Sequence, residues 1–240
     1  MSKDIKLFTA HGVSPHSIYQ AENNPNPLFS VLSALSERPE RVIRLFKNSQ
    51  IPKNGKYKIS VYLDGLWRDI VIDDRVPCIP YSGRLLPAFL GSKNTEIWAM
   101  MLEKAIAKLS GSYSSIKNYS TSQLLQILTG APSSTTSIKN KIEKLGMSTK
   151  EDIWKILVHS EARGDVVVAK THFKANTVIS RSGKTIETGL LENAGYTFLG
   201  CYELNEGQLD NTEAKTQFVK LRNPWGNNKE WKLRWGKGSK

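Results

Sequence analysis

Residues 96–113 read EIWAMMLEKAIAKLSGSY, and their apolar side chains recur at the spacing of an α-helix. The apolar positions are Trp98, Met101, Leu102, Ala105, Ile106 and Leu109. Side chains three and four residues apart share one face of a helix, so this stretch predicts an amphipathic helix with one buried side.

Three more elements are predicted on either side of that helix: a helix from Asn26-Pro27 to Pro39, a β-hairpin over residues 57–72, and a helix over residues 122–129. Asn is a good N-cap and Pro suits the first helical turn, which supports the first of these. The hairpin is predicted from alternating apolar residues on either side of Asp64-Gly65, a dipeptide typical of tight turns.

The second half of the chain has a different pattern. Residues 131–137 are rich in Ser, Thr and Pro and predict a linker, and Ser148 to Glu151 forms a capping box for a helix that ends near Gly164. Strand-like runs follow over residues 165–173, 196–204 and 217–222. Helices first and strands second indicate an α+β fold with two subdomains, 1–132 and 133–240.

Composition narrows the class of protein. No run of about 18 apolar residues and no signal-like N-terminus occurs, so we expect a soluble, intracellular protein without a membrane anchor. Cys78 and Cys201 are the two cysteines, and both are expected to be buried structural thiols. The net charge of +12 favours acidic partners such as nucleic acid or acidic protein tails. Much of this positive charge lies in residues 215–240, which hold eight Lys or Arg and one acidic residue, Glu230.

Seven segments spread over the chain carry a family resemblance: SALSERPERVIRLF (33–46), GLWRDIVIDDRVPC (65–78), EIWAMMLEKAIAKLSGSY (96–113), LTGAP (128–132), ARGD (162–165), GYTFLGCYEL (195–204) and VKLRNPWG (219–226). In this order they resemble the calpain-type cysteine protease core. The resemblance implies a papain-like fold with a helical N-terminal subdomain and an antiparallel, β-barrel-like C-terminal subdomain. The family's barrel continues beyond the last segment, so the second subdomain is expected to be truncated.

The family uses a Cys-His-Asn triad and a glutamine that helps hold the oxyanion. By the resemblance, Gln20 matches that glutamine, Asn223 the asparagine, and Trp225 the tryptophan that shields it. Asn26 stands where the family has its cysteine, and Ala194 where it has its histidine. We therefore expect a pseudoprotease rather than an enzyme. The alternative is an active calcium-dependent cysteine endopeptidase with a displaced nucleophile.

Many members of this family bind calcium at two sites. Glu96 matches a carboxylate ligand of the first site, but Ser17 stands where the family usually offers an aspartate. Glu230 matches a ligand of the second site, and Lys237 falls near the position of its partner. Calcium prefers several carboxylate oxygens, so we expect weak binding at most at the first site and none at the second.

The favoured function is a structural or interaction module within a larger assembly. The resemblance to non-catalytic calpain-like proteins of protists points to a cytoplasmic, cytoskeletal or ciliary setting with acidic tubulin as a partner, and a ribonucleoprotein comes next. The docking surface is expected at Lys232, Arg234 and Lys237, beside an open edge of the barrel.

Overall fold

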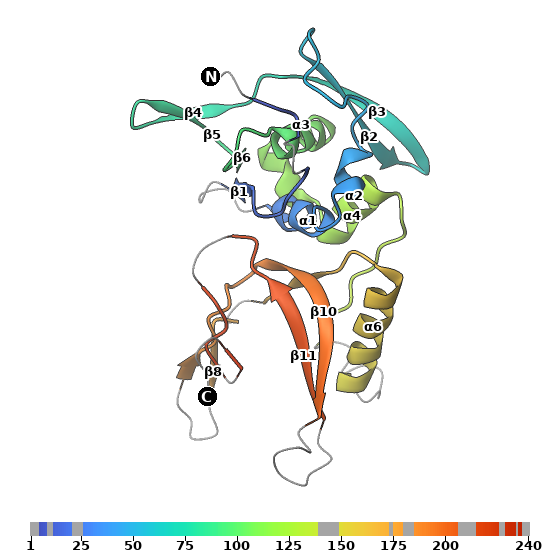
Figure 1. Cartoon of the computed structure of the whole chain (residues 1–240), viewed down its shortest axis with the longest axis vertical. Coiled ribbons are helices and arrows are strands. Elements are labelled where there is room, and N and C mark those ends of the chain that lie inside the picture. The colour runs from blue at the N-terminus through green and yellow to red at the C-terminus, as the bar shows by residue number, and fades with distance from the viewer. Residues whose placement is uncertain are drawn as a thin grey trace. The chain divides into compact units, whose positions relative to one another are not determined.

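The structure is a computed structural model. It describes residues 5–8, 12–20, 26–138, 149–172, 175–179, 185–205, 215–225, 229–233 and 235–236. The chain divides into two compact units (Figure 1). Unit 1 comprises Met1–Ser133 with Pro224–Asn227, and unit 2 comprises Ser134–Asn223 with Asn228–Lys240. The assignment of subdomains 1–132 and 133–240 stays a prediction.

Unit 1 contains four α-helices and a 3-10 helix in its described part: α1 Pro27–Leu35, α2 Pro39–Ile43, α3 Trp98–Ser110, η1 Ser114–Asn118 and α4 Thr121–Thr129. The predicted helices over residues 98–109 and 122–129 are confirmed. Pro39 does not end the first helix as expected. Helix α1 already ends at Leu35, with Ser36 as its C-cap, and Pro39 occupies the first turn of α2, where its missing N–H costs no hydrogen bond.

The expectation of a mainly helical first half is corrected to a mixed unit, because the described part of unit 1 also holds six strands. These are β1 Ile18–Gln20, β2 Lys56–Leu63, β3 Leu66–Asp73, β4 Cys78–Tyr81, β5 Arg84–Pro87 and β6 Leu90–Ser92, paired antiparallel as β1–β6, β2–β3 and β4–β5. The predicted hairpin is confirmed as β2–β3. Asp64 (φ 50°) and Gly65 (φ 80°) form its turn in left-handed backbone conformations that Asp and Gly tolerate.

The core of unit 1 lies between its helices and the inner face of β2. Helix α1 contacts α4, and both α3 and α4 contact β2. Trp98, Tyr57 and Phe29 are its largest fully buried side chains. The alternation of Tyr57, Ile59 and Val61 explains this, since every second side chain of a strand points to the same face.

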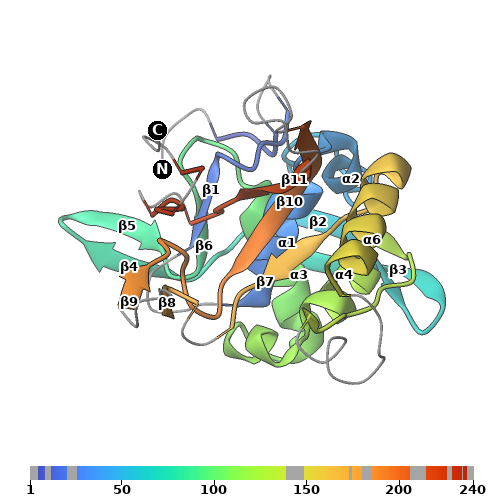
Figure 2. The same ribbon diagram turned by 90° about the horizontal axis from the view of Figure 1, so that it is seen from below.

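Unit 2 holds helix α6 (Thr149–Arg163) and five strands in its described part: β7 Val168–Lys170, β8 Thr177–Ile179, β9 Thr185–Glu187, β10 Gly195–Asn205 and β11 Lys215–Arg222. Its larger sheet is antiparallel in the order β11-β10-β7, and α6 packs against β10 (Figure 2). Strands β8 and β9 form a separate hairpin.

The described residues of unit 2 form no closed barrel, so the barrel-like expectation is corrected to a mixed unit with a three-stranded sheet. The three predicted strand regions are confirmed as β7, β10 and β11, although β7 is shorter than its run. The predicted helix is confirmed as α6, whereas Ser148 of its capping box lies outside the described residues. No helix in the described parts of the chain is long and apolar enough to cross a membrane.

Candidate functional site

The N-terminus of α1 is built around Asn26. Its backbone is extended (φ −134°, ψ 153°), and its Oδ1 accepts a hydrogen bond from the Leu28 N–H at 3.0 Å, with Pro27 in the first turn. An N-cap of this kind satisfies a backbone donor that the helix cannot pair internally. Asn26 is only 8% exposed, so this amide helps fix where α1 begins.

The other end of the same amide contacts a buried carboxylate. Asn26 Nδ2 donates to Glu103 Oε1 at 3.3 Å, and the Leu90 N–H donates to Glu103 Oε2 at 2.9 Å. Glu103 therefore connects the start of α1, the middle of α3 and the first residue of β6. It is 2% exposed.

Burial changes the chemistry of Glu103. Desolvation raises the pKa of this carboxyl to about 7, and the two hydrogen bonds from Leu90 and Asn26 oppose that rise in part. Glu103 and Tyr113 both line a small cavity of about 10 Å³. Burial, with the Glu103 charge as a second cause, raises the pKa of the Tyr113 phenol above the usual range. With a pKa of about 7, the Glu103 carboxyl gains or loses its proton near neutral pH.

The sequence reasoning missed Glu103, although a signal was present. Ala99 lies four residues before it and Ile106 three residues after it, and both are buried apolar residues on the same side of α3. A carboxylate between two apolar positions of a helical stripe indicates a buried acid that needs partners.

Gln20 lies near this cluster in the sheet. It is the last residue of β1, and its Cα partner in β6 is Leu90, which also bonds Glu103. Gln20 is 8% exposed. Strand pairing therefore brings Gln20 next to Leu90, which Glu103 links to Asn26. Its role as an oxyanion ligand stays a prediction.

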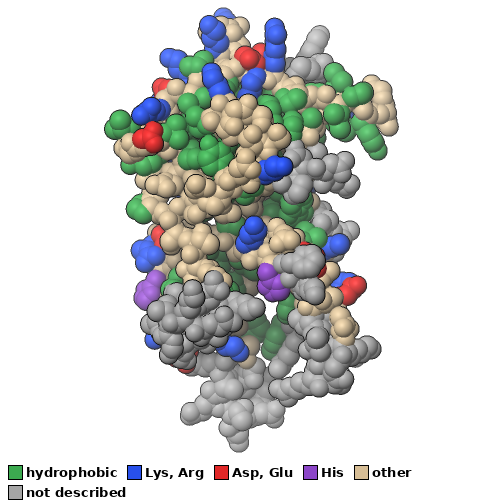
Figure 3. Space-filling model, turned by 180° about the vertical axis from the view of Figure 1, so that it is seen from behind, with side chains coloured by type: hydrophobic (Ala, Val, Ile, Leu, Met, Phe, Trp, Pro, Cys, Tyr) green, Lys and Arg blue, Asp and Glu red, His purple; other side chains and the backbone are tan. Residues whose placement is uncertain are grey.

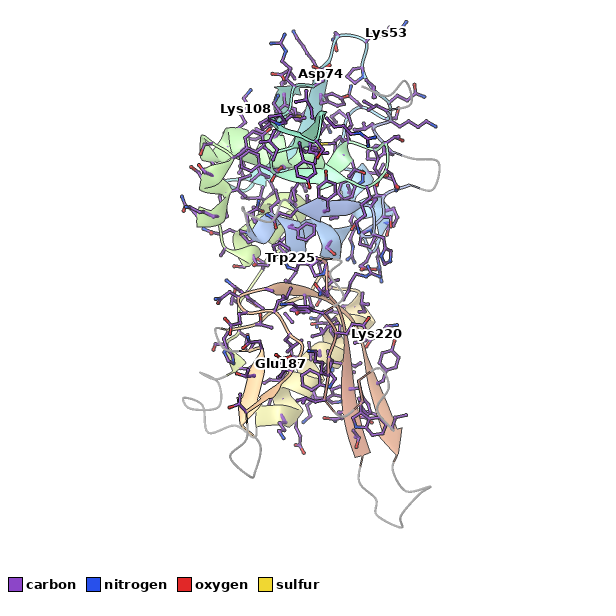
Figure 4. The ribbon with its side chains drawn as sticks, turned by 90° about the vertical axis from the view of Figure 1, so that its left-hand side faces the viewer. Lys53, Asp74, Lys108, Glu187, Lys220 and Trp225 are labelled. Carbon is purple, nitrogen blue, oxygen red and sulfur yellow. The ribbon has the colours of Figure 1, made fainter. Side chains whose placement is uncertain are left out.

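Trp225 joins unit 1 although it lies far along the chain. Its ring meets Phe29 of α1 edge to face, with centroids 5.2 Å apart and planes at 70° (Figure 4). Pro224 beside it is buried. Such an aromatic pair adds stabilisation beyond the buried area, so the segment Pro224-Trp225 is anchored on the helix that Asn26 begins.

Ala194 and Asn223 belong to unit 2, at the same end of the β10–β11 pair, where Thr197 faces Arg222. The Ala194 N–H donates to Thr171 Oγ1 at 2.9 Å, and its carbonyl accepts from the Thr171 N–H at 2.9 Å. Asn223 Nδ2 donates to the Lys229 carbonyl at 3.1 Å. That these two residues meet Gln20 and Asn26 at a cleft stays a prediction.

The two cysteines differ in environment. Cys78 begins β4 and is exposed, which corrects the expectation of a buried thiol. Cys201 lies in β10, where partial burial and then the nearby Glu161 carboxylate raise the pKa of its thiol. Of the two, Cys78 is the more accessible to a thiol reagent.

Glu96 shares one feature with a cation ligand, namely a buried carboxylate. It is 1% exposed, and neither carboxylate oxygen has a hydrogen-bond partner in the described part of the chain. Ser17, the other first-site position, offers a neutral hydroxyl that already donates to the Ser14 carbonyl at 2.8 Å. Among the described residues, no group of three or more His, Cys, Asp or Glu could hold a metal ion. Glu96 thus fits calcium chemistry without a second carboxylate to complete the site.

Only part of the expected basic docking surface lies within the described residues. Lys232 Nζ lies 2.6 Å from Glu187 Oε2, so its charge is paired within unit 2. This contact lowers the pKa of Glu187, mainly through the hydrogen bond from Lys232. Glu230 is exposed, and Arg234 and Lys237 lie outside the described residues.

Comparison with known proteins agrees with the resemblance over the full length. The model of the calpain family of cysteine proteases matches residues 1–240. Calpain clp-1 of Caenorhabditis elegans is 27% identical over 243 residues, covering 100% of this chain and 28% of that protein. Calpain-type cysteine protease DEK1 of Zea mays is 28% identical over 245 residues, covering 100% of this chain and 10% of that protein. Calpain-13 of Rattus norvegicus is 26% identical over 242 residues, covering 97% of this chain and 32% of that protein.

The chain spans less than a third of the length of each of these relatives. The expectation that it is not an enzyme is corrected by the same finding, because the family that it matches from end to end is one of cysteine proteases. The order of the segments and the full-length match agree: the chain belongs to the calpain family of cysteine proteases.

Proposed function

We propose that this calpain-family core binds a polypeptide partner and acts as an interaction module within a larger assembly. The observation that carries the proposal is the excess of basic residues at positions 215–240, which hold eight Lys or Arg against Glu230. Both polar atoms of the Asn26 side chain are used within unit 1, one to cap α1 and the other to bond Glu103, so the start of α1 offers no free amide to a partner.

The partner class follows from charge. A net charge of +12 attracts acidic proteins, and the acidic tails of tubulin in a cytoplasmic, cytoskeletal or ciliary setting are the favoured partner. A ribonucleoprotein comes second, because phosphates attract the same lysines and arginines. We place the contact at Lys232, Arg234 and Lys237. The first of these must share its charge with Glu187.

Co-sedimentation with tubulin polymers tests this proposal, with polymers whose acidic tails have been removed as the comparison. Reversing the charge at Lys232, Arg234 and Lys237 should weaken binding in a salt-sensitive way, whereas Asn26→Ala should do little. Binding that survives tail removal and all three reversals would overturn the proposal. Binding lost on Asn26→Ala alone would move the contact to the α1 site.

A second candidate is a calcium-dependent cysteine endopeptidase, which the full-length family match favours. The nucleophile would then be Cys78 or Cys201, the two thiols of the chain. Hydrolysis of fluorogenic peptides, with and without calcium, tests this candidate. Activity lost in Cys78→Ser or Cys201→Ser would support it, and activity that neither substitution changes would refute it.

Calcium itself is proposed to bind weakly at most. Glu96 would be its carboxylate ligand, and we propose no site at Glu230. A bound calcium ion would supply positive charge beside Glu96, in the loop before α3.

A further inference from the structure

Strand β3 has an outer edge without a strand partner among the described residues. In the β2–β3 pair, Lys58 faces Val71 and Ser60 faces Asp69. The backbone groups of Lys58 and Ser60 form hydrogen bonds on the edge of β2 that faces away from β3. The Ser60 N–H donates to the Leu45 carbonyl at 2.7 Å, and the Lys58 carbonyl accepts from Lys47 at 3.0 Å. Lys58–Val71 and Ser60–Asp69 are therefore pairs of the antiparallel ladder that do not exchange hydrogen bonds with each other.

In such pairs, both residues turn their backbone groups away from each other. The N–H and C=O groups of Asp69 and Val71 thus point to the free edge of β3. The described residues pair β3 with β2 and with no other strand. No described group accepts a hydrogen bond from either of these two N–H groups.

Lysines of α3 occupy part of this edge. Lys108 Nζ donates to the Val71 carbonyl at 2.8 Å. Lys104 Nζ donates to the Arg75 carbonyl and pairs with the Asp73 carboxylate, which lowers the pKa of Asp73. Exposed sheet edges are commonly protected by lysines in this manner. A lysine protects carbonyl oxygens and leaves the N–H groups open.

A groove of about 520 Å³ runs between β3 and α3 at this edge. Its apolar lining includes Val71, Ile72 and Ala107. Lys56, Lys104 and Lys108 line it as well. The groove lies wholly in residues 56–113 of unit 1.

The surface around the groove is basic. Two further lysines, Lys53 and Lys58, are exposed, and neither forms an ion pair within the described part of the chain. Figure 3 shows Lys and Arg side chains gathered at the top of the view, and Figure 4 places Lys53 and Lys108 at this end of unit 1. Of the carboxylates present, Asp73 is paired with Lys104, and Asp69 accepts a hydrogen bond from Ser60 Oγ at 2.7 Å. Asp74 adds one exposed negative charge. The balance stays positive.

We propose that the free edge of β3 and the groove beside it bind an extended acidic peptide segment of a partner protein. The peptide adds a strand to β3, and its carbonyls accept hydrogen bonds from the Asp69 and Val71 N–H groups. Its carboxylates pair with Lys56 and Lys108 and compete with Asp73 for Lys104, and its alternate apolar side chains fill the groove. Lys108 leaves the Val71 carbonyl on binding, which frees that oxygen for the added strand.

This site is separate from the C-terminal basic residues and does not depend on the proposed function. The phosphates of a polyanion such as RNA can contact the same lysines and accept from single N–H groups, but RNA has no peptide backbone whose N–H and C=O groups match the spacing of a strand edge. The open donors and the apolar groove are the observations that favour a peptide.

The experiment uses the full chain and a fluorescent peptide of alternating Glu and Val, with binding measured by fluorescence anisotropy. We expect saturable binding that weakens as salt is added. Reversal of Lys104 and Lys108 to Glu should weaken binding about tenfold or more. The matched control, Lys150→Glu with Lys155→Glu on the exposed side of α6, changes the net charge equally and should leave affinity unchanged.

Backbone pairing is tested without risk to folding by N-methylating every second residue of the peptide, in each of the two registers. One methylated peptide should lose binding, and the other should bind as the parent does. Val71→Pro removes an edge N–H that makes no bond to β2 and should also weaken binding.

Three results would overturn the proposal. Equal binding of both methylated peptides would show a surface for negative charge alone. Tighter binding of an RNA oligonucleotide, lost in the Lys104 and Lys108 variant, would assign the surface to nucleic acid. A dimer in sedimentation that Val71→Pro dissociates would assign the edge to a second copy of this chain.

Discussion

Replacing Glu103 with Gln should remove a pH dependence from the stability of unit 1. The folded state raises the pKa of Glu103 to about 7 from an ordinary value of 4.5. Between these values the folded chain keeps a proton that the unfolded chain has released. Stability from this group is therefore full below about pH 4.5 and declines as the pH rises, until it levels off above about pH 7.

The size of the effect follows from the difference in pKa. A shift of about 2.5 units corresponds to about 3.4 kcal/mol, at 1.36 kcal/mol per unit. Between pH 5 and pH 8 the loss should be about 2.5 kcal/mol. The glutamine amide cannot ionise, but its single carbonyl oxygen can accept only one of the two hydrogen bonds that Glu103 accepts from Asn26 and Leu90. That cost does not depend on pH, so the stability of Glu103→Gln relative to the parent chain should rise by about 2.5 kcal/mol between pH 5 and pH 8.

Urea-induced unfolding at several pH values measures this difference, with hydrogen exchange of the α3 amides assigning the transition to unit 1. Glu40→Gln, which changes an exposed carboxylate in the same unit, is the matched control and should follow the parent at each pH. If the parent and Glu103→Gln gave parallel stability curves from pH 5 to pH 8, Glu103 would be ionised throughout and the desolvation argument would be wrong.

The remaining predictions concern a helix cap, a glycine and a carboxylate. Asn26→Ala should lower the stability of unit 1 by about 1–2 kcal/mol in urea unfolding, because the cap of α1 is lost, and an unchanged midpoint would count against the cap. Gly130→Ala should cost more than Gly111→Ala in thermal unfolding. Both glycines have positive φ, 71° and 84°, but a Cβ at Gly130 would lie 2.8 Å from the Trp67 ring, and one at Gly111 meets nothing within 4 Å. Glu96→Gln should weaken any calcium binding seen by titration calorimetry, whereas an unchanged isotherm would place the ion elsewhere.

Local elements followed well from the sequence because their signals lie within a few residues. Asn26-Pro27 starts α1, Asp64-Gly65 turns the β2–β3 hairpin, and the apolar stripe around Trp98 forms α3. In each case a side chain or a φ preference acts on its own backbone. Pro39 was misread for a related reason, because the same ring can end one helix or begin the next.

The short pairs β1–β6 and β4–β5 were missed, since three or four residues carry little periodicity. Their partners can lie far apart in the chain, as with Ile18 and Ser92, and such pairing is decided by packing rather than by local preference. The barrel expectation came from the family resemblance, and the described strands of unit 2 form a three-stranded sheet and a separate hairpin instead.

The family, the net charge and the residue types at the candidate site can be read from the amino-acid sequence alone. The contacts of those residues are visible only in the folded chain: Asn26 and Leu90 meet on a buried Glu103, Trp225 packs on Phe29, and Lys232 is paired with Glu187. The physical reason is that a pKa, an ion pair or an aromatic contact depends on the distance to groups from other elements and on the water between them. Sequence order does not contain these distances.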